Sequence, residues 1–318
     1  MGVNLDKPGR WKPDIARSVD LYNDWFVKFA PKAYRESRAR TAREVEATLK
    51  ATDNLRNVKP EILRENPAVL PTLRMATCPP LARDRLSGLS RVPRTIVNRL
   101  DKEHKLPARM AASALNGQLR KIGAVIEKLA GHDLCSWLER GAVPTAAELE
   151  RASTVIADRL CGATADPIIR NAQEARQLKL IGQWLNERGY RPAPAGRGVK
   201  FETLPAGSCA FRLNVPADEG ERRINIPVDV AIKPKTASAR DCPICIAAKS
   251  AGDFANVNKR RKEEAQKMSQ LRRTYGDRVQ YLLFLCGYVD SGYLGYEASE
   301  GIDWVWEHRT DDLAEFGL

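Results

Sequence analysis

The residues best suited to chemistry lie on two short apolar runs, Ile224 to Ile232 and Pro243 to Ala248, which a polar connection separates. Both runs are rich in Ile, Val and Cys and are bounded by Pro, Lys, Ser and Asp, so they are predicted to form neighbouring strands of a hairpin. If the connection turns near residues 237 to 239, residues whose numbers sum to about 476 face each other. Asp229 then lies opposite Ala247.

A carboxylate and an amine are therefore expected to converge on one small patch. Directly opposed residues of an antiparallel pair have Cβ atoms roughly 5 Å apart, and positions 247 and 249 share a face because side chains repeat every second residue. Asp229, position 247 and Lys249 would thus meet. A hard divalent cation needs oxygen ligands and charge neutralisation, so two carboxylates hold it better than one. The middle position is occupied by Ala247, which offers no oxygen.

The elements that must position these residues follow one another from residue 167 onward. The patterns predict a helix over residues 167 to 189, a strand over 210 to 215, the two strands of the hairpin, a basic helix, and a buried strand over 279 to 289. The order is helix, three strands, helix, strand. Residues 1 to 165 have mostly helical patterns, and a boundary is predicted near Cys161 to Asp166. The sequence therefore predicts a helical N-terminal region, 1–165, and a second domain, 166–318.

The charge of the chain favours a polyanionic partner. Its formal charge is +12 and its pI is about 9.5. Between residues 255 and 275 the basic residues are Lys259, Arg260, Arg261, Lys262, Lys267, Arg272 and Arg273. A solvated helix face would explain such a run in isolation, but its position directly after a candidate metal site favours contacts with phosphates. Arg83 and Arg85, near Pro79 and Pro80, either meet guanine edges or phosphates or belong to an ordinary helix surface.

The remaining composition narrows the class of protein. Seven cysteines are scattered through a chain without a signal-peptide pattern, which predicts reduced thiols in the cytoplasm. Cys242 and Cys245 have the spacing of half a zinc site, but no second pair matches them. The longest strongly apolar run, near Tyr281 to Cys286, is far shorter than the roughly 20 residues that a membrane span needs. We therefore expect a cytoplasmic protein without a membrane segment.

The predicted αβββαβ order, with Pro227-Val228-Asp229 on one strand and Ala247-Ala248-Lys249 on the next, resembles the core of the PD-(D/E)XK nucleases. Two longer strings, CPICIAAKSAGDFANVNKRRKEEAQK from Cys242 and CPPLARDRL from Cys78, are similar to the XamI-type type II restriction endonucleases. The resemblance covers most of the chain, beginning with VDLYNDWF at residues 19 to 26. It implies an α+β fold: a restriction-endonuclease-like core preceded by a largely helical region.

The resemblance also implies a function and a set of site residues. It implies a homodimeric, Mg²⁺-dependent endonuclease that cuts both strands of double-stranded DNA at a short palindrome, with GTCGAC as the family expectation. Asp229 matches the metal-binding aspartate, and Lys249 matches the lysine that orients or activates the attacking water. Ala247 stands where the family pattern has the second metal-binding Glu. Phosphates would be gripped by Lys259, Arg260, Arg261 and Lys262, and bases would be read from the helical region, with Arg83 and Arg85 as candidates.

Two explanations account for Ala247. The preferred one is a Glu→Ala change that leaves DNA binding intact and disables cleavage. The other is a natural variant whose carboxylate has moved, with Glu174 on the preceding helix, Asp253 or Glu263 as candidates. An alternative function from another class is a noncatalytic DNA-binding protein on a nuclease fold, and an RNA-processing or repair nuclease would use the same core. Magnesium-dependent cleavage by an Ala247→Glu revertant would distinguish the restriction endonuclease from the noncatalytic DNA-binding protein.

Overall fold

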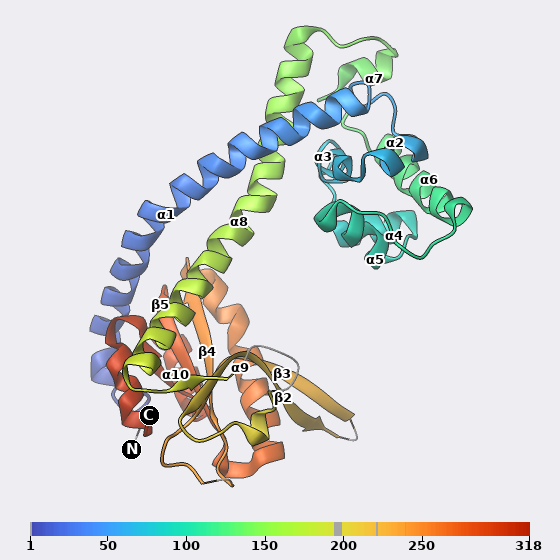
Figure 1. Ribbon diagram of the computed structural model, residues 1–318. Helices are drawn as coiled ribbons and strands as arrows, with labels where there is room; N and C mark the ends of the chain where they lie inside the picture. The colour runs from blue at the N-terminus through green and yellow to red at the C-terminus, as the bar shows by residue number, and fades with distance from the viewer. Residues whose placement is uncertain (1, 194–198, 221, 239) are drawn as a thin grey trace. The chain divides into compact units, whose positions relative to one another are not determined.

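The computed structural model describes residues 2–193, 199–220, 222–238 and 240–318, and for residues 255–261 it describes the backbone alone. The chain divides into two compact units. The sheet unit contains Met1–Phe29 and Arg170–Leu318, and the helical unit contains Ala30–Ile169. Two long helices, α1 (Pro8–Ala51) and α8 (Ala146–Glu187), each contribute to both units (Figure 1). The division predicted from the sequence had assigned the first 29 residues to the helical region.

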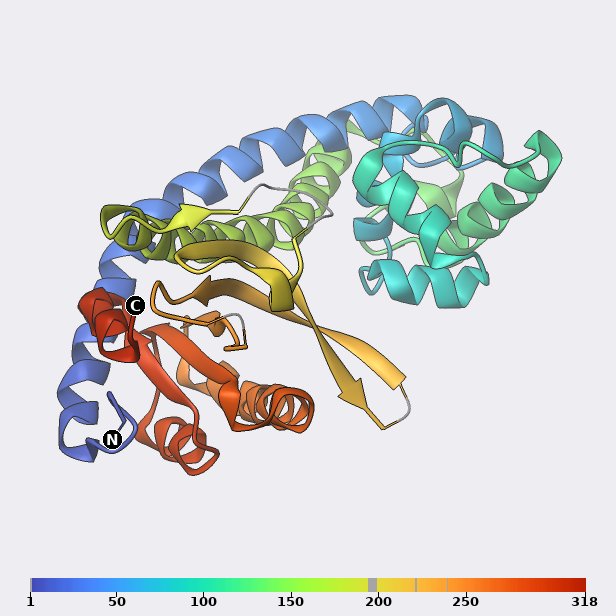
Figure 2. The same cartoon turned by 60° about the horizontal axis from the view of Figure 1, so that its bottom comes forward.

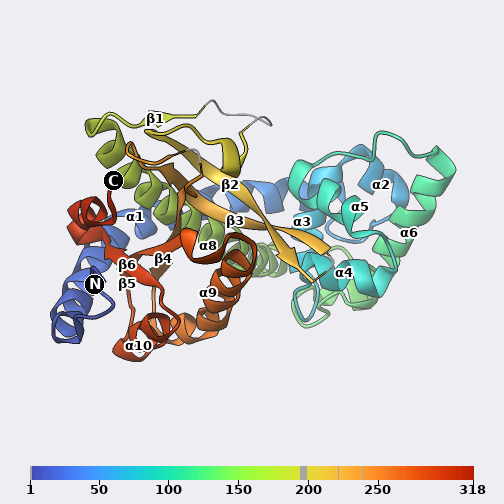
Figure 3. The same cartoon turned by 90° about the horizontal axis from the view of Figure 1, so that it is seen from below.

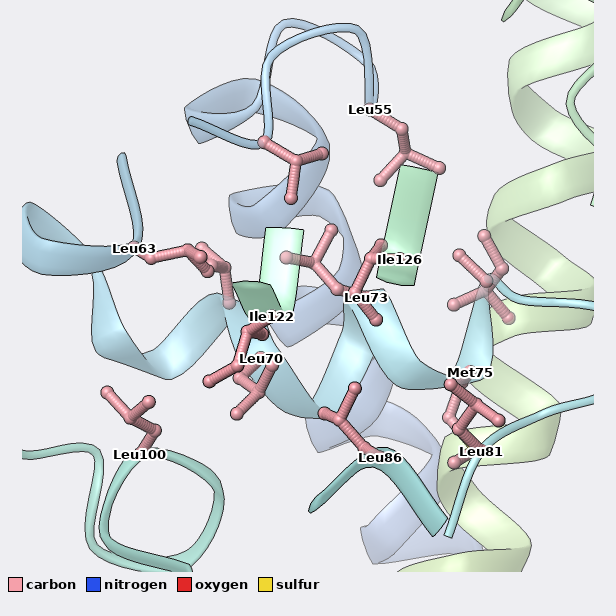
Figure 4. Packing of buried hydrophobic residues seen from close by; sticks show 14 of the residues in the cluster. Leu55, Leu63, Leu70, Leu73, Met75, Leu81, Leu86, Leu100, Ile122 and Ile126 are labelled. Atoms are coloured by element: carbon pink, nitrogen blue, oxygen red, sulfur yellow. The ribbon is translucent and has the colours of Figure 1, made fainter. Parts of the chain in front are cut away.

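The helical unit is built from short helices around a leucine-rich core. Between α1 and α8 lie α2 (Pro60–Glu65), α3 (Leu70–Met75), α4 (Arg83–Ser90), α5 (Arg94–Asn98), α6 (Ala112–Lys128) and α7 (Ser136–Arg140). Figure 4 shows side chains from four helices gathered in one cluster: Leu63 of α2, Leu70 and Leu73 of α3, Leu86 of α4 and Ile122 of α6. Burial of these apolar side chains is the main favourable contribution to packing in helices too short to be stable alone.

Helix α8 corrects one prediction. The sequence patterns began a new helix at Pro167, but α8 continues through Pro167 without interruption. Proline in a helix interior costs one backbone hydrogen bond. The helix persists because its buried positions stay in register on both sides of the proline. Every fourth residue from Ala165 to Ile181 is buried or half-buried: Ala165, Ile169, Gln173, Gln177 and Ile181.

The sheet unit contains a mixed six-stranded sheet in the order β1-β2-β3-β4-β5-β6. The strands are β1 (Arg191–Pro192), β2 (Ser208–Glu219), β3 (Arg222–Lys233), β4 (Ile244–Ala251), β5 (Gln280–Gly287) and β6 (Asp303–Trp306). β2, β3 and β4 pair antiparallel, whereas β1, β5 and β6 each pair parallel with a neighbour. Figure 2 shows β2 and β3 extending together as a long two-stranded ribbon. The predicted α+β class and αβββαβ order are confirmed.

Helices cover both faces of this sheet. Helices α9 (Phe254–Tyr275) and α10 (Ser291–Ser299) lie together on one face, which we call the α9 face (Figure 3). The end of α8 packs on the other, the α8 face, together with the 3₁₀ segment η5 (Glu307–Phe316). Strand β5 is buried on both faces, as its apolar run without alternation predicted. In β4, Cys245 and Ala247 belong to the core of the α9 face, and Ile244 and Ile246 to that of the α8 face.

The N-terminal segment is anchored to the last strand. The Asp303 carboxylate accepts hydrogen bonds from the backbone N–H groups of Val3, Asn4 and Leu5, at 2.6, 3.0 and 3.0 Å. The side-chain amide of Asn4 donates to the carbonyl oxygen of Trp304. Both chain ends therefore belong to the sheet unit (Figure 1). In the part of the chain described, no helix is long and apolar enough to span a membrane.

Candidate active site

The strand register brings the predicted residues together. β3 and β4 pair Val230 with Ile246 and Ile232 with Ile244, and the numbers of each pair sum to 476 as predicted. The pairing of β3 with β4 ends at Val230, and the next residue toward the start of β3 is Asp229. Its Oδ2 accepts a hydrogen bond from the backbone N–H of Ala248 at 2.8 Å. The carboxylate thus takes the place of a ladder bond at the point where the two strands separate.

A polar cavity of about 580 Å³ opens at this separation. Asp229 lines it from β3 and Lys249 from β4, so two of the three predicted residues share one site. The other lining residues come from α8, β4 and α9 and are mostly polar or charged: Arg170, Asn171, Gln173, Glu174, Gln177, Ala248, Ser250 and Glu263. Gln177 donates a hydrogen bond to the carbonyl oxygen of Phe284 at 3.2 Å, which ties α8 to the middle of the sheet.

The acidic groups of the cavity are held by specific partners. Burial raises the pKa of Asp229 and the Glu174 carboxylate adds to that rise, whereas the Ala248 N–H and the Lys249 ammonium oppose it. Glu174 accepts a hydrogen bond from Arg212 at 2.9 Å. Arg212 has φ +53°, a conformation that residues other than glycine adopt rarely. We infer that this local distortion of β2 aims the guanidinium toward Glu174.

The third predicted residue lies outside the cavity. Ala247 has 2% of its surface exposed, is absent from the cavity lining, and packs in the core of the α9 face. The methyl group of Ala247 is too short to reach the cavity, whereas the longer Lys249 side chain on the same face of β4 extends into it. The convergence of positions 229, 247 and 249 on one metal site stays a prediction. Position 247 supplies no oxygen to the site.

Lys249 has a partner that sequence reasoning missed. Its Nζ lies 2.9 Å from Oε1 of Glu264, a fully buried residue of α9. Lys267 Nζ also lies 3.2 Å from Oε1 of Glu264, and the Tyr281 hydroxyl donates a hydrogen bond to Oε2. Burial raises the pKa of Glu264, but the two ammonium groups and the hydroxyl outweigh it, so the net direction is downward. Helical spacing could have revealed this, because Glu264 continues the buried stripe Met268, Leu271 and Tyr275.

The other predicted residues are distributed over both units. Glu174 and Glu263 line the cavity, and Asp253 is exposed beyond the end of β4. Lys262 is exposed on α9. Lys259, Arg260 and Arg261 lie on the same helix, but their side chains fall outside the described residues.

The two predicted arginines of the helical unit differ in their contacts. Arg83 lies 3.2 Å from Asp101, whose carboxylate also binds the buried Arg74 at 2.6 Å. Arg85 is exposed. Arg83 is thus held partly by a structural ion pair, whereas the side chain of Arg85 faces solvent.

The cavity residues fit a magnesium ion of the kind that keeps most of its water. Among the described residues, no group of three or more His, Cys, Asp or Glu side chains forms a closed metal cage. Mg²⁺ is commonly bound through one or two carboxylates, with waters and substrate phosphates completing its shell. Asp229 and Glu174 supply two carboxylates to the same cavity. The donor set is open, which leaves coordination positions for water or another ligand.

A family model and a relative of similar length indicate the same class of enzyme. The family model described as XamI restriction endonuclease matches residues 53–306. The type II restriction enzyme SalI of Streptomyces albus G is 50% identical over 315 residues, covering 99% of both chains. A crystal structure of protein VC1899 from Vibrio cholerae aligns with 91% of this chain and 55% of its own, with 12% identity and a TM-score of 0.27. A likeness this low carries no further argument.

Proposed function

Because this chain belongs to the XamI restriction endonuclease family, we propose that it is a Mg²⁺-dependent type II endonuclease that cuts both strands of double-stranded DNA at a short palindrome. GTCGAC is the expected site. A homodimer acting in the cytoplasm completes the proposal, because a two-fold symmetric target matches a two-fold symmetric protein. The observation that carries it is the cavity in which Asp229 and Lys249 meet where β3 and β4 separate.

The cavity residues have distinct parts in phosphodiester hydrolysis. A bound magnesium ion would polarise a phosphate oxygen and lower the pKa of a coordinated water. Asp229 and Glu174 would hold that ion from opposite elements, β3 and α8. Lys249 stabilises the negative charge that develops on the phosphate during attack. The Ala248 N–H fixes the orientation of the Asp229 carboxylate, so its second oxygen is left for the cavity.

DNA binding rests on the positive charge of the chain. A net charge of +12 favours association with a polyanion, and counterion release makes such binding weaken steeply with salt. The exposed Lys262 and the basic stretch before it would contact backbone phosphates, which set the register but carry no sequence information. Arg85 is the exposed candidate for reading bases in the helical unit.

Ala247 favours a second candidate function. A site with fewer carboxylates holds a divalent cation less well, so the chain would bind its palindrome while cutting it slowly or not at all. In the extreme case it is a noncatalytic DNA-binding protein on a nuclease fold. The alternative within the enzyme proposal is that the carboxylate has moved elsewhere.

Cleavage of matched plasmids tests the proposed function. One plasmid carries a single GTCGAC site and the other carries a scrambled site, each with Mg²⁺ or with EDTA. We expect linear product only from the first plasmid in Mg²⁺, and none with Asp229→Asn. Cleavage of both plasmids alike would contradict site specificity. A binding selection on randomised duplexes identifies the target if GTCGAC is not recognised, and it also works for a chain that binds without cutting.

A further inference from the structure

We propose that Glu264 of α9, whose carboxylate lies beside position 247, is the residue that positions Lys249 for catalysis. The inference rests on the proposed nuclease function and deepens it. It names a residue outside the three carboxylates, Glu174, Asp253 and Glu263, that the sequence offered as replacements. It also predicts that the chain is an active enzyme.

The strand pairing places the Glu264 carboxylate beside Ala247. β4 and β5 pair in parallel, with Cys245 opposite Tyr281 and Ala247 opposite Leu283. Cys245, Ala247, Tyr281 and Leu283 all belong to the core of the α9 face. Glu264 binds Lys249, two residues after Ala247 on β4, and also the hydroxyl of Tyr281 on β5. Its carboxylate therefore bridges the residues on both sides of the position where a Glu side chain would start.

The buried space on this face accommodates one charged carboxylate. Glu264 is fully buried and is balanced by the ammonium groups of Lys249 and Lys267. Glu297 of α10 is also fully buried, and burial together with the nearby Glu264 raises its pKa to about 8. Glu297 is therefore largely protonated at neutral pH. A Glu at 247 would bring another acid against the same two ammonium groups, and like charges in low dielectric are unfavourable.

Glu264 acts through Lys249, without reaching the substrate. Its two oxygens already accept from two ammonium groups and one hydroxyl, and the residue has no exposed surface. Lys249 differs, because its side chain is 22% exposed and lines the cavity. A charge-assisted hydrogen bond of this kind is short and directional. It fixes where the ammonium group stands when a phosphate enters.

Four chains test the inference: the parent, Glu264→Gln, Ala247→Glu and the double variant. For each chain we measure single-turnover cleavage, in Mg²⁺, of a duplex that contains the palindrome bound by the parent. DNA binding is measured in EDTA, and stability is measured by urea unfolding. Glu264→Gln keeps the shape of the side chain and removes its charge. Because the buried charge that orients Lys249 is lost, we expect cleavage to slow by about 10- to 100-fold with DNA binding unchanged, the range known for partners that orient the ligands of metal sites. Glu264→Asp keeps the negative charge but shortens the side chain by one methylene, so the cleavage rate should fall by a smaller factor than in Glu264→Gln.

The two remaining chains distinguish replacement from simple support. Ala247→Glu alone should be less stable than the parent and cut no faster, whereas the double variant should recover most of the rate lost in Glu264→Gln. A matched control is Glu307→Gln, which removes the acid of another buried ion pair, Arg176–Glu307, outside the cavity lining. It should lower stability and leave the cleavage rate of the folded protein unchanged.

The outcomes separate the inference from the function beneath it. An undiminished rate in Glu264→Gln, or a double variant no faster than that single variant, overturns the inference. A parent that does not cut, with an Ala247→Glu chain that does, also overturns it and supports the disabled form of the enzyme. If neither cuts any duplex that the parent binds, the nuclease function itself fails and the inference fails with it.

Discussion

The two faces of the sheet contain similar ion pairs with different surroundings. On the α9 face, Lys249 lies 2.9 Å from the fully buried Glu264, and on the α8 face Arg176 lies 2.8 Å from Glu307, whose side chain is 3% exposed. Lys249 lines the polar cavity, whereas Arg176 stacks on the ring of Trp25 at 4.9 Å. Burial and distance alone therefore do not distinguish the two ion pairs. The surroundings of the cation do.

Replacing the two cations gives the largest expected contrast. Lys249→Met should slow single-turnover cleavage by about 100- to 1,000-fold, the usual cost of removing one group that stabilises transition-state charge. Arg176→Met should lower the unfolding free energy instead, since it leaves Glu307 buried without its partner. Rates measured on folded protein at saturating DNA check this. A comparable slowing by both variants would remove the distinction between the faces.

Replacing the two acids should destabilise the protein to a similar degree on both faces. Glu264→Gln and Glu307→Gln each leave a cation without its buried counter-charge, and we expect each to lower the unfolding free energy by about 1 to 3 kcal/mol. Urea titration at one pH and salt concentration measures both. Similar losses combined with unequal cleavage rates would show that Glu264 has a role beyond stability. The comparison would lose its force if only Glu264→Gln were destabilised.

The α9 face should also respond to pH through Glu297. Its pKa is raised to about 8 by burial, so the folded protein keeps a proton that the unfolded chain releases at lower pH. The unfolding free energy should therefore fall as pH rises from the ordinary glutamate range to about 8, by about 1 kcal/mol per pH unit. Glu297→Gln should remove this slope in urea titrations from pH 6 to 8. The same change at the exposed Glu315 provides the control and should leave the slope as in the parent.

The smallest effect is expected from substitutions in the helical unit, where one arginine is held in an ion pair and another is exposed to solvent. Arg83 pairs with Asp101, whereas Arg85 is exposed. Arg85→Ala should weaken DNA binding and reduce the dependence of log affinity on log salt by about one unit, as the loss of one phosphate contact does. Arg83→Ala should chiefly lower thermal stability. Binding titrations at several salt concentrations decide, and an unchanged slope for Arg85→Ala would place that residue outside the DNA contact.

Much of the site was predictable because a hairpin obeys simple geometry. The register of β3 and β4 followed from the turn position, so Asp229 was correctly placed beside the start of the Ala248-Lys249 segment. Position 247 was harder, because alternation gives the face of a residue but not how far its side chain extends. The αβββαβ order followed from apolar runs. Helix α10 and strand β6 lie beyond the last element that the sequence patterns predicted, and their Tyr, Trp and Gly residues fit no single period.

The two features that the sequence analysis missed, the role of Glu264 and the continuation of α8 through Pro167, share one physical cause. Glu264 was not singled out from the sequence, and although helical spacing places it on the buried stripe of α9, its pairing with Lys249 and Tyr281 follows only from contacts with β4 and β5. Pro167 was taken as a helix start because local preference disfavours proline in a helix interior. Packing along α8 overrides that preference. Both errors come from tertiary contacts, which the local pattern of the chain does not contain.

The hydrogen bonds from the backbone of Val3, Asn4 and Leu5 to Asp303 affect how the protein would respond to proteolysis. The sheet unit is assembled from the two extremities of the polypeptide, with the helical unit inserted between them in sequence. A protease that cuts the chain within the helical unit would therefore leave two fragments that stay associated through the sheet unit. The sheet unit would therefore stay assembled after a cut that divides the chain.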